Sequence, residues 1–392
     1  MKKALLKCIF SLCAICSLAA QGLTVSGILD SSVAVRAGAG DAPAFSYGVE
    51  EYANLRMQAK IRDRATVFGA VNFIAAAGNY AADAALLAGY TAANNYGISP
   101  TAFAAGDNFI AAFELERLYF RLNGEAVGFD GGLLRLPFGY GQVWGSSDFL
   151  NPKNPLKPDA RPRAVLGAGL SWYPVDTLKL LGFGAAPRDP FSRGGEGGLV
   201  GVSLDQHWDK ASVQGLYSFE SPNDGSGYGI HRAGLSVKAD VEVGLVMDAL
   251  YTYNHEAGTE IDGLSFSIGA DYSFFDGDLI VLAEYLYNGD TSSTALGYGG
   301  SFSNNNYLYT GATWRFNDFT NMSVALISGF DDVSFTPVIT LNHDLFQGAA
   351  LIVTAQIPLD RDLFSADGRH GELGPYNTGR YFDCGVKLRL RF

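Results

Sequence analysis

The C-terminal segment of the chain alternates between apolar residues and charged or small ones. Residues 380–392 read Arg-Tyr-Phe-Asp-Cys-Gly-Val-Lys-Leu-Arg-Leu-Arg-Phe. Successive side chains of a β-strand point to opposite faces. One face would therefore carry Phe382, Cys384, Val386, Leu388, Leu390 and Phe392, and the other Asp383, Lys387, Arg389 and Arg391. Such a strand fits a soluble sandwich with its apolar face in the core, or a barrel with its apolar face toward lipid.

The aromatic last residue, Phe392, decides between these two environments. An ending of alternating apolar positions and a terminal aromatic residue resembles the closing strand of bacterial outer-membrane β-barrels. The resemblance implies that the barrel-assembly machinery reads this strand, with Phe392 as the assembly signal, and that the strand pairs with the first one. It also implies an even number of antiparallel strands, outer-membrane lipid as surroundings, and both termini in the periplasm.

The N-terminal segment has the features of a secretory signal peptide. Three lysines precede an apolar stretch at 8–18, which small residues follow. We predict that residues 1–22 are removed, with cleavage after Ala19 or after Gly22. Cys16 leaves a lipoprotein as the alternative. The expected location is the cell outer membrane.

Composition favours a single all-β unit over residues 23–392. No linker divides the 392 residues, Gly (48), Tyr (20) and Phe (26) are abundant, and charged residues make up only 17%. The mature part has no run of about 20 apolar residues, so a helical membrane protein is excluded. We predict a transmembrane antiparallel up-and-down β-barrel.

Charge and cysteine usage limit the partners further. Loss of the three lysines of the signal peptide moves the formal net charge from −12 to −15. A strongly acidic exported protein is a poor nucleic-acid binder, so no nucleic acid is expected as a partner. Cys384 is the only cysteine after residue 22, so it has no intramolecular disulfide partner.

Segments of about ten residues with period-two patterning recur between turn-rich gaps. We predict eighteen strands, with sixteen as the alternative, at 23–36, 48–62, 65–76, 111–122, 125–136, 163–173, 177–186, 197–208, 211–220, 229–239, 241–254, 262–274, 279–288, 305–316, 320–329, 333–342, 349–358 and 379–392. Short turns and long gaps alternate, and the long gaps are expected to face outward. Residues 79–95 are Ala-rich and predict a short helix. Glu114 and Glu116 are in phase with Leu118, so the upper end of 111–122 is expected to project above the bilayer.

The third long gap, residues 137–163, is the candidate constriction loop. The strand ending in Leu-Arg-Leu and the following Trp144-Gly145, Asp148-Phe149 and Asn151-Pro152 resemble a segment of substrate-specific outer-membrane porins, including the alginate-export kind. The Gly-Arg-Gln that usually follows this strand in that family is replaced by Pro137-Phe138-Gly139. No role for an arginine is therefore expected at these positions. The candidate residues are Trp144, Asp148, Asn151, Lys153, Arg161 and Arg163. The alternative is a rigid surface loop with solvated lysines.

Charged residues on the expected lumen faces form two sets. The basic set is Arg56, Lys60, Arg62, Arg117, Arg121, Lys387, Arg389 and Arg391. The acidic set, expected to oppose it, is Asp30, Asp205, Asp248, Asp271 and Glu284. Arginines inside a water-filled pore attract anions, and their fork geometry suits carboxylate or phosphate. The alternative is that these charges only pair across strands and keep the lumen hydrated.

The predicted function is a porin, a passive diffusion channel for small hydrophilic solutes with a preference for anionic ones. The five histidines have no metal-ligand spacing and no Gly-x-Ser-x-Gly elbow occurs, so we expect neither an enzyme nor a metal or cofactor. A surface adhesin or structural barrel, and a transporter of hydrophobic compounds, are the alternatives. The protein is expected to be a monomer or a homotrimer.

Overall fold

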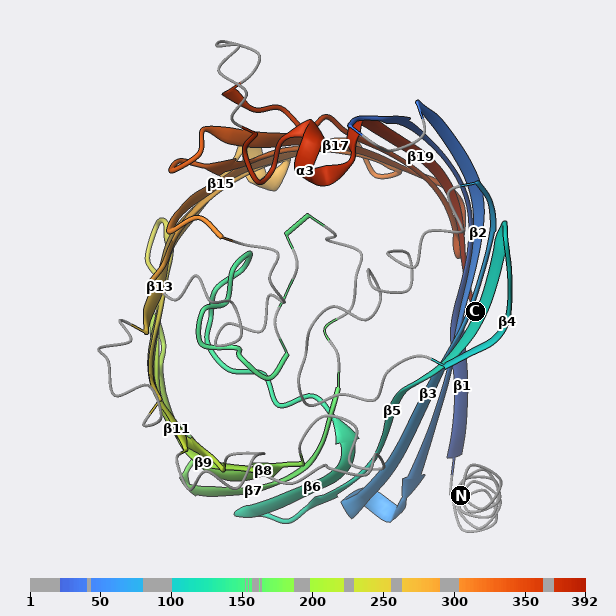
Figure 1. Cartoon of the computed structure of the whole chain (residues 1–392). Coiled ribbons are helices and arrows are strands. Elements are labelled where there is room, and N and C mark those ends of the chain that lie inside the picture. The colour runs from blue at the N-terminus through green and yellow to red at the C-terminus, as the bar shows by residue number, and fades with distance from the viewer. Residues whose placement is uncertain are drawn as a thin grey trace.

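The computed structural model describes residues 22–40, 44–79, 101–151, 153, 155–156, 162, 164–186, 198–221, 229–254, 263–289, 303–361 and 370–392. These residues form a closed antiparallel β-barrel (Figure 1). The predicted signal peptide, apart from Gly22, and the helix predicted at 79–95, apart from Asn79, lie outside the described residues. No helix within the described ranges is long and apolar enough to cross a membrane.

Eighteen strands make the wall, each paired antiparallel with the next, and the last pairs with the first. They are β1 (Gly22–Gly38), β2 (Phe45–Ile61), β3 (Ala65–Gly78), β5 (Phe109–Asn123), β6 (Val127–Leu134), β7 (Val165–Val175), β8 (Leu178–Ala185), β9 (Leu199–Trp208), β10 (Ala211–Glu220), β11 (Ile230–Asp240), β12 (Gly244–Asn254), β13 (Leu264–Phe274), β14 (Leu279–Asn288), β15 (Asn306–Asn317), β16 (Thr320–Gly329), β17 (Ser334–Phe346), β18 (Ala349–Gln356) and β19 (Arg380–Arg391). The prediction of an eighteen-stranded all-β barrel is confirmed.

The helical elements within the described ranges are three short pieces, and Arg361 also has 3-10 geometry. The 3-10 turns η1 (Arg62–Arg64) and η3 (Phe275–Gly277) join β2 to β3 and β13 to β14. Such short connections define the turn end of the barrel. The helix α3 (Pro375–Thr378) lies at the opposite end, the loop end, between β18 and β19 (Figure 1).

The structure contains a nineteenth strand, β4 (Thr101–Gly106), within the segment 77–110, where no strand was predicted. One edge of β5 pairs with β3, and its other edge is shared between β6 near the turn end and β4 near the loop end. The two strands β4 and β5 are joined by the turn at Asp107 and Asn108. Alanine and glycine have low strand propensity, so the segment gave no strand signal.

A β-bulge in β5 overturns the expectation that Glu114 and Glu116 share a face with Leu118. Ala70 of β3 is opposite Arg117, whereas Val71 is opposite Leu115, so Glu116 is an extra residue. A bulge of this kind shifts the alternation by one residue. Glu116 is only 6% exposed and accepts a hydrogen bond from Asn54 Nδ2 inside the barrel. The interpretation that this end of the strand projects above the bilayer because of its glutamates is therefore wrong.

The wall has an apolar outside and a polar inside. On β9, Val200, Val202 and Leu204 are exposed on the outer face, whereas the alternating Ser203 and Asp205 are buried inside. A water-soluble protein has the opposite arrangement, so this distribution fits a barrel surrounded by lipid.

The seam between β1 and β19 closes around Gly27. The Gly27 N–H donates to the Phe392 carbonyl at 2.8 Å, and the Phe392 N–H donates to the Gly27 carbonyl at 3.2 Å. A Cβ atom at position 27 would lie 2.4 Å from Cζ of the Phe392 ring. The terminal ring therefore covers the backbone of β1 at a position where only glycine leaves space for it.

We expect Gly27→Leu to weaken closure of the barrel, because the new side chain and the Phe392 ring would occupy the same volume. Overpacking of this kind costs about 1–3 kcal/mol. The urea midpoint of the refolded barrel in detergent, followed by heat-modifiable gel mobility, measures the effect. Gly215→Leu is the matched control, since a Cβ at Gly215 of β10 meets no atom within 4 Å. Equal midpoints for the two variants would contradict the assignment of Phe392 to the seam.

Candidate functional site

The described residues between β6 and β7 enter the barrel instead of remaining at its rim. We call the described residues of 137–163 the inner loop. Figure 1 shows its first part as the green trace inside the ring of strands. Trp144 and Leu150 in this loop are fully buried. The predicted candidates Arg161 and Arg163 lie outside the described residues.

Six consecutive backbone N–H groups hold the inner loop against the wall. The donors are residues 139–144, and the acceptors are side chains on the inner faces of β10, β12 and β14, namely Gln214, Asp248 and Glu284. The two oxygens of Asp248 accept one bond each at 2.9 Å, and those of Glu284 accept three bonds at 2.9 to 3.0 Å. A hydrogen bond to an ionised acceptor is roughly twice as strong as a neutral one. These carboxylates therefore fix the course of the loop.

Two glycines allow the loop backbone to approach Asp248. A Cβ at Gly139 would lie 2.5 Å from Asp248 Oδ2, and one at Gly141 would lie 2.9 Å from the same atom. Gly139 also has a φ of +79°, in the left-handed region that favours glycine. The amino-acid sequence contains Gly-Tyr-Gly at 139–141, but it gives no indication that the Asp248 carboxylate lies beneath these residues.

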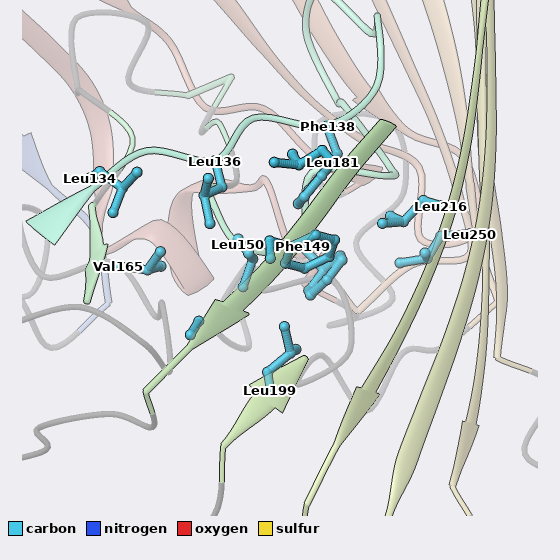
Figure 2. Close-up of a cluster of buried hydrophobic side chains, with 12 residues drawn as sticks. Leu134, Leu136, Phe138, Phe149, Leu150, Val165, Leu181, Leu199, Leu216 and Leu250 are labelled. Carbon is cyan, nitrogen blue, oxygen red and sulfur yellow. The ribbon is translucent and has the colours of Figure 1, made fainter. Parts of the chain in front are cut away.

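Apolar packing reinforces the hydrogen bonds on one side of the loop. Figure 2 shows Phe138, Phe149 and Leu150 of the loop among side chains from the inner faces of β8, β9, β10 and β12. The Phe138 ring lies 4.8 Å from the ring of Phe183 on β8. The inner wall is therefore apolar where Phe138, Phe149 and Leu150 pack on it, which explains why those strands lack a fully polar inner face.

A second apolar cluster surrounds Trp144. Its ring lies 5.5 Å from that of Tyr307 on β15, and its Nε1–H donates to the Glu284 carbonyl at 3.2 Å. The other buried members are Val143, Leu286, Ile327 and Leu373. Leu373 belongs to the connection between β18 and β19, so this cluster also joins the inner loop to that connection. The candidate Trp144 is thus an anchor with no exposed surface.

Asp148 and Asn151 stabilise the loop internally. The Asn151 N–H donates to Asp148 Oδ1 at 3.1 Å, and the Leu136 N–H donates to Asn151 Oδ1 at 2.8 Å. Burial raises the pKa of the Asp148 carboxyl well above its usual range, because hydrogen bonds and the charge of Lys153 offset only part of the desolvation. Neither side chain is exposed, so both act on the shape of the loop.

The five acidic candidates do not form one exposed wall. Asp248 and Glu284 lie beneath the inner loop, and Asp205 accepts a hydrogen bond from Gln214 Nε2. Asp271 accepts one at 2.6 Å from Gln142 Nε2. Four of the five therefore lie on β9, β12, β13 and β14 and bind the loop or its neighbours, whereas Asp30 lies on β1.

The basic candidates on the closing strands face Asp30. Arg389 donates from Nε and from a terminal nitrogen to the two oxygens of Asp30, at 2.8 Å each. Lys387 Nζ lies 4.0 Å from the same carboxylate. Sequence reasoning placed Asp383 on the charged face but missed its two partners, Arg36 at 3.2 Å and Arg380 at 2.7 Å. The sequence could have revealed Arg36, because the alternation of the first strand places Arg36 on the same face as Asp30.

The remaining basic candidates continue along β2 and β5. Arg56 Nε donates to Asn54 Oδ1 at 2.6 Å, and Arg121 pairs with Asp130 at 2.6 Å. Arg117 lies over the ring of Phe68, 4.5 Å from its centroid. Lys60, Arg62 and Arg391 are exposed near the turn end. In the ring of eighteen strands, β1 and β11 are diametrically opposite, so the basic arc (β19, β1, β2, β5) faces the arc that holds the inner loop (Figure 1).

No metal site accompanies these charges in the described part of the chain, where no group of three or more His, Cys, Asp or Glu side chains could hold an ion.

Comparison with known proteins gives a likeness of fold. No family model and no curated protein matches the sequence. The structure is similar to Pseudomonas aeruginosa OccK2 (OpdF), with a TM-score of 0.58 and 9% identity over 95% of this chain and 98% of that one. It is also similar to P. aeruginosa OpdL, with a TM-score of 0.56 and 12% identity over 94% and 98% of the two chains. A third similar structure is Acinetobacter baumannii OccAB4, with a TM-score of 0.55 and 13% identity over 95% and 98%. The chain therefore shares the β-barrel fold of these three proteins.

Proposed function

We propose that this protein is an outer-membrane porin, a channel for passive diffusion of small hydrophilic solutes with a preference for anionic ones. The observation that carries the proposal is the inner loop, which is fixed inside a barrel whose other inner arc is lined by polar and basic side chains. The protein is exported through the predicted signal peptide and is inserted into the membrane through its C-terminal strand.

The distribution of exposed aromatic residues supports a membrane position. Toward the turn end they include Trp208, Phe274, Trp314, Phe316, Phe346 and Phe392. Toward the loop end they include Phe45, Tyr47, Tyr217, Tyr251, Tyr253 and Tyr381. Two such belts flanking an apolar band are typical of outer-membrane barrels, where the rings lie at the two interfaces.

The charge balance of the two arcs supports the anionic preference. On the loop-bearing arc, the carboxylates of Asp248 and Glu284 are buried and bound by backbone N–H groups, so they do not reach a solute. On the basic arc, the carboxylate of Asp30 faces two cations, Arg389 and Lys387. Asp383 likewise faces Arg36 and Arg380. Each of these two carboxylates faces two cations, so an excess of positive charge remains along this arc. Such an excess attracts anions in a hydrated pore.

The first test is ion selectivity in a planar bilayer. We expect steady single-channel currents and a reversal potential in a KCl gradient that indicates preference for chloride. Replacing Arg56 and Arg389 together by alanine should lower the chloride-to-potassium permeability ratio by roughly twofold or more, because two lumen charges are lost.

Lys210→Ala serves as the charge control, since Lys210 is exposed in the turn between β9 and β10. Absence of current from the correctly folded protein would contradict the channel. A ratio that is unchanged in the double variant would contradict the role of the basic arc only.

The second test concerns the anchoring of the inner loop. Glu284→Ala removes the acceptor of three N–H groups, and buried groups left without a partner cost about 1–3 kcal/mol each. We expect the loop to leave the wall for part of the time, which should appear as added current noise and altered conductance. Asp271→Asn is the control, because Asp271 contacts only the side chain of Gln142 among the donors of this loop. Identical traces for Glu284→Ala and Asp271→Asn would show that Glu284 does not hold the loop.

A further inference from the structure

Lys153 lies on the side of the inner loop that faces away from the wall. Its Nζ donates to the carbonyl of Gly141 at 2.6 Å and to that of Gln142 at 3.3 Å. The same two peptide units contain the N–H groups of Gln142 and Val143, which donate to Glu284 Oε2 at 3.0 Å. In a trans peptide unit the N–H and C=O point in opposite directions. The carbonyls therefore point from β14 toward the barrel interior, and the ammonium group is bound on that side.

The inner loop consequently separates charges of opposite sign. The carboxylates of Asp248 and Glu284 are on its wall side and buried, whereas the Lys153 side chain is partly exposed. An ammonium group has three donors. The contacts described above use two of them, and because both acceptors are neutral carbonyl groups, they fix the position of the charge. That charge also acts on the buried carboxyls of Asp148 and Asp248.

The inner loop thus presents a cation to the same space as the basic arc does from the opposite side. The basic arc carries Arg389 and Lys387 beside Asp30, across the barrel from β11. An anionic group that passes between the two would meet positive charge on both sides. A neutral or cationic solute would gain no such contact from the loop.

We propose that Lys153 is a selectivity-determining residue of the channel, whose ammonium group contacts the carboxylate or phosphate group of a passing solute at the inner loop. The proposal rests on the proposed porin function and deepens it. It assigns the contact between the inner loop and the anionic group of the solute to Lys153. The arginines of the basic arc provide the contact on the opposite side of the solute.

Removal and chemical restoration of the charge tests this role. In a Cys384→Ser background, which has no other cysteine after residue 22, Lys153→Cys should lower the chloride-to-potassium permeability ratio roughly two- to fivefold. Aminoethyl methanethiosulfonate, which attaches an ammonium group to the thiol, should restore the ratio. The sulfonatoethyl reagent, which attaches an anion, should lower it further. Inorganic phosphate should reduce the chloride current through the parent channel more than through the unmodified Lys153→Cys channel.

Lys210→Cys in the same background is the control, and neither reagent should change its selectivity. A second pair, Lys153→Arg and Lys153→Gln, separates charge from loop structure, because both keep a donor for the two carbonyls. We expect Lys153→Arg to keep the chloride-to-potassium permeability ratio of the parent channel and Lys153→Gln to lower it. A conducting channel whose ratio is the same in all Lys153 variants, with or without reagent, would overturn the assignment. A parent protein that folds but never conducts would instead overturn the porin function itself.

Discussion

The structure depends on the pairing of β19 with β1, because this pairing leaves no strand of the wall with an open edge. In hydrocarbon there is no water to satisfy backbone N–H and C=O groups, so a lipid-facing sheet must close on itself. The register at the seam places the last residue beside Gly27, where the chain has no side chain. The alternation of the strands then directs apolar residues outward and polar residues inward, except where inner-face apolar residues pack against the inner loop. The sequence pattern and the closed topology thus have a single physical cause.

An eighteen-stranded barrel is too wide for the side chains of its wall to fill, and larger barrels of this kind leave a lumen. Here the inner loop occupies part of the interior by contacts of two kinds. Its backbone N–H groups bind carboxylates of β12 and β14, and its aromatic residues pack on apolar inner faces. Buried carboxylates without a cation are costly unless several donors bind them. The row of six N–H groups supplies those donors, so loop and wall stabilise each other.

The same arrangement has an electrostatic consequence for the proposed channel. Carboxylates that would otherwise attract cations are covered by the loop, and a lysine lies on the loop's other side. On the opposite arc, Asp30 faces Arg389 and Lys387, and Asp383 faces Arg36 and Arg380. In the proposed channel, positive charge therefore lies on the interior side of the loop and on the basic arc, even though the chain as a whole is acidic. Net charge alone would have suggested the opposite preference.

The sequence alone determined the strand pattern. Period-two alternation together with the terminal Phe392 gave the barrel class. The repeated segments between turn-rich gaps gave the number of wall strands and, for β10, β14 and β16, the exact bounds. It did not give β4, whose small residues carry little strand signal, or the bulge at Glu116, which depends on the register with β3. It selected Asp248 and Glu284 as lumen charges but could not show that they bind a loop more than 100 residues away in the chain. That contact was decided by the tertiary structure, since only the closed barrel brings the inner loop across to the strands it binds.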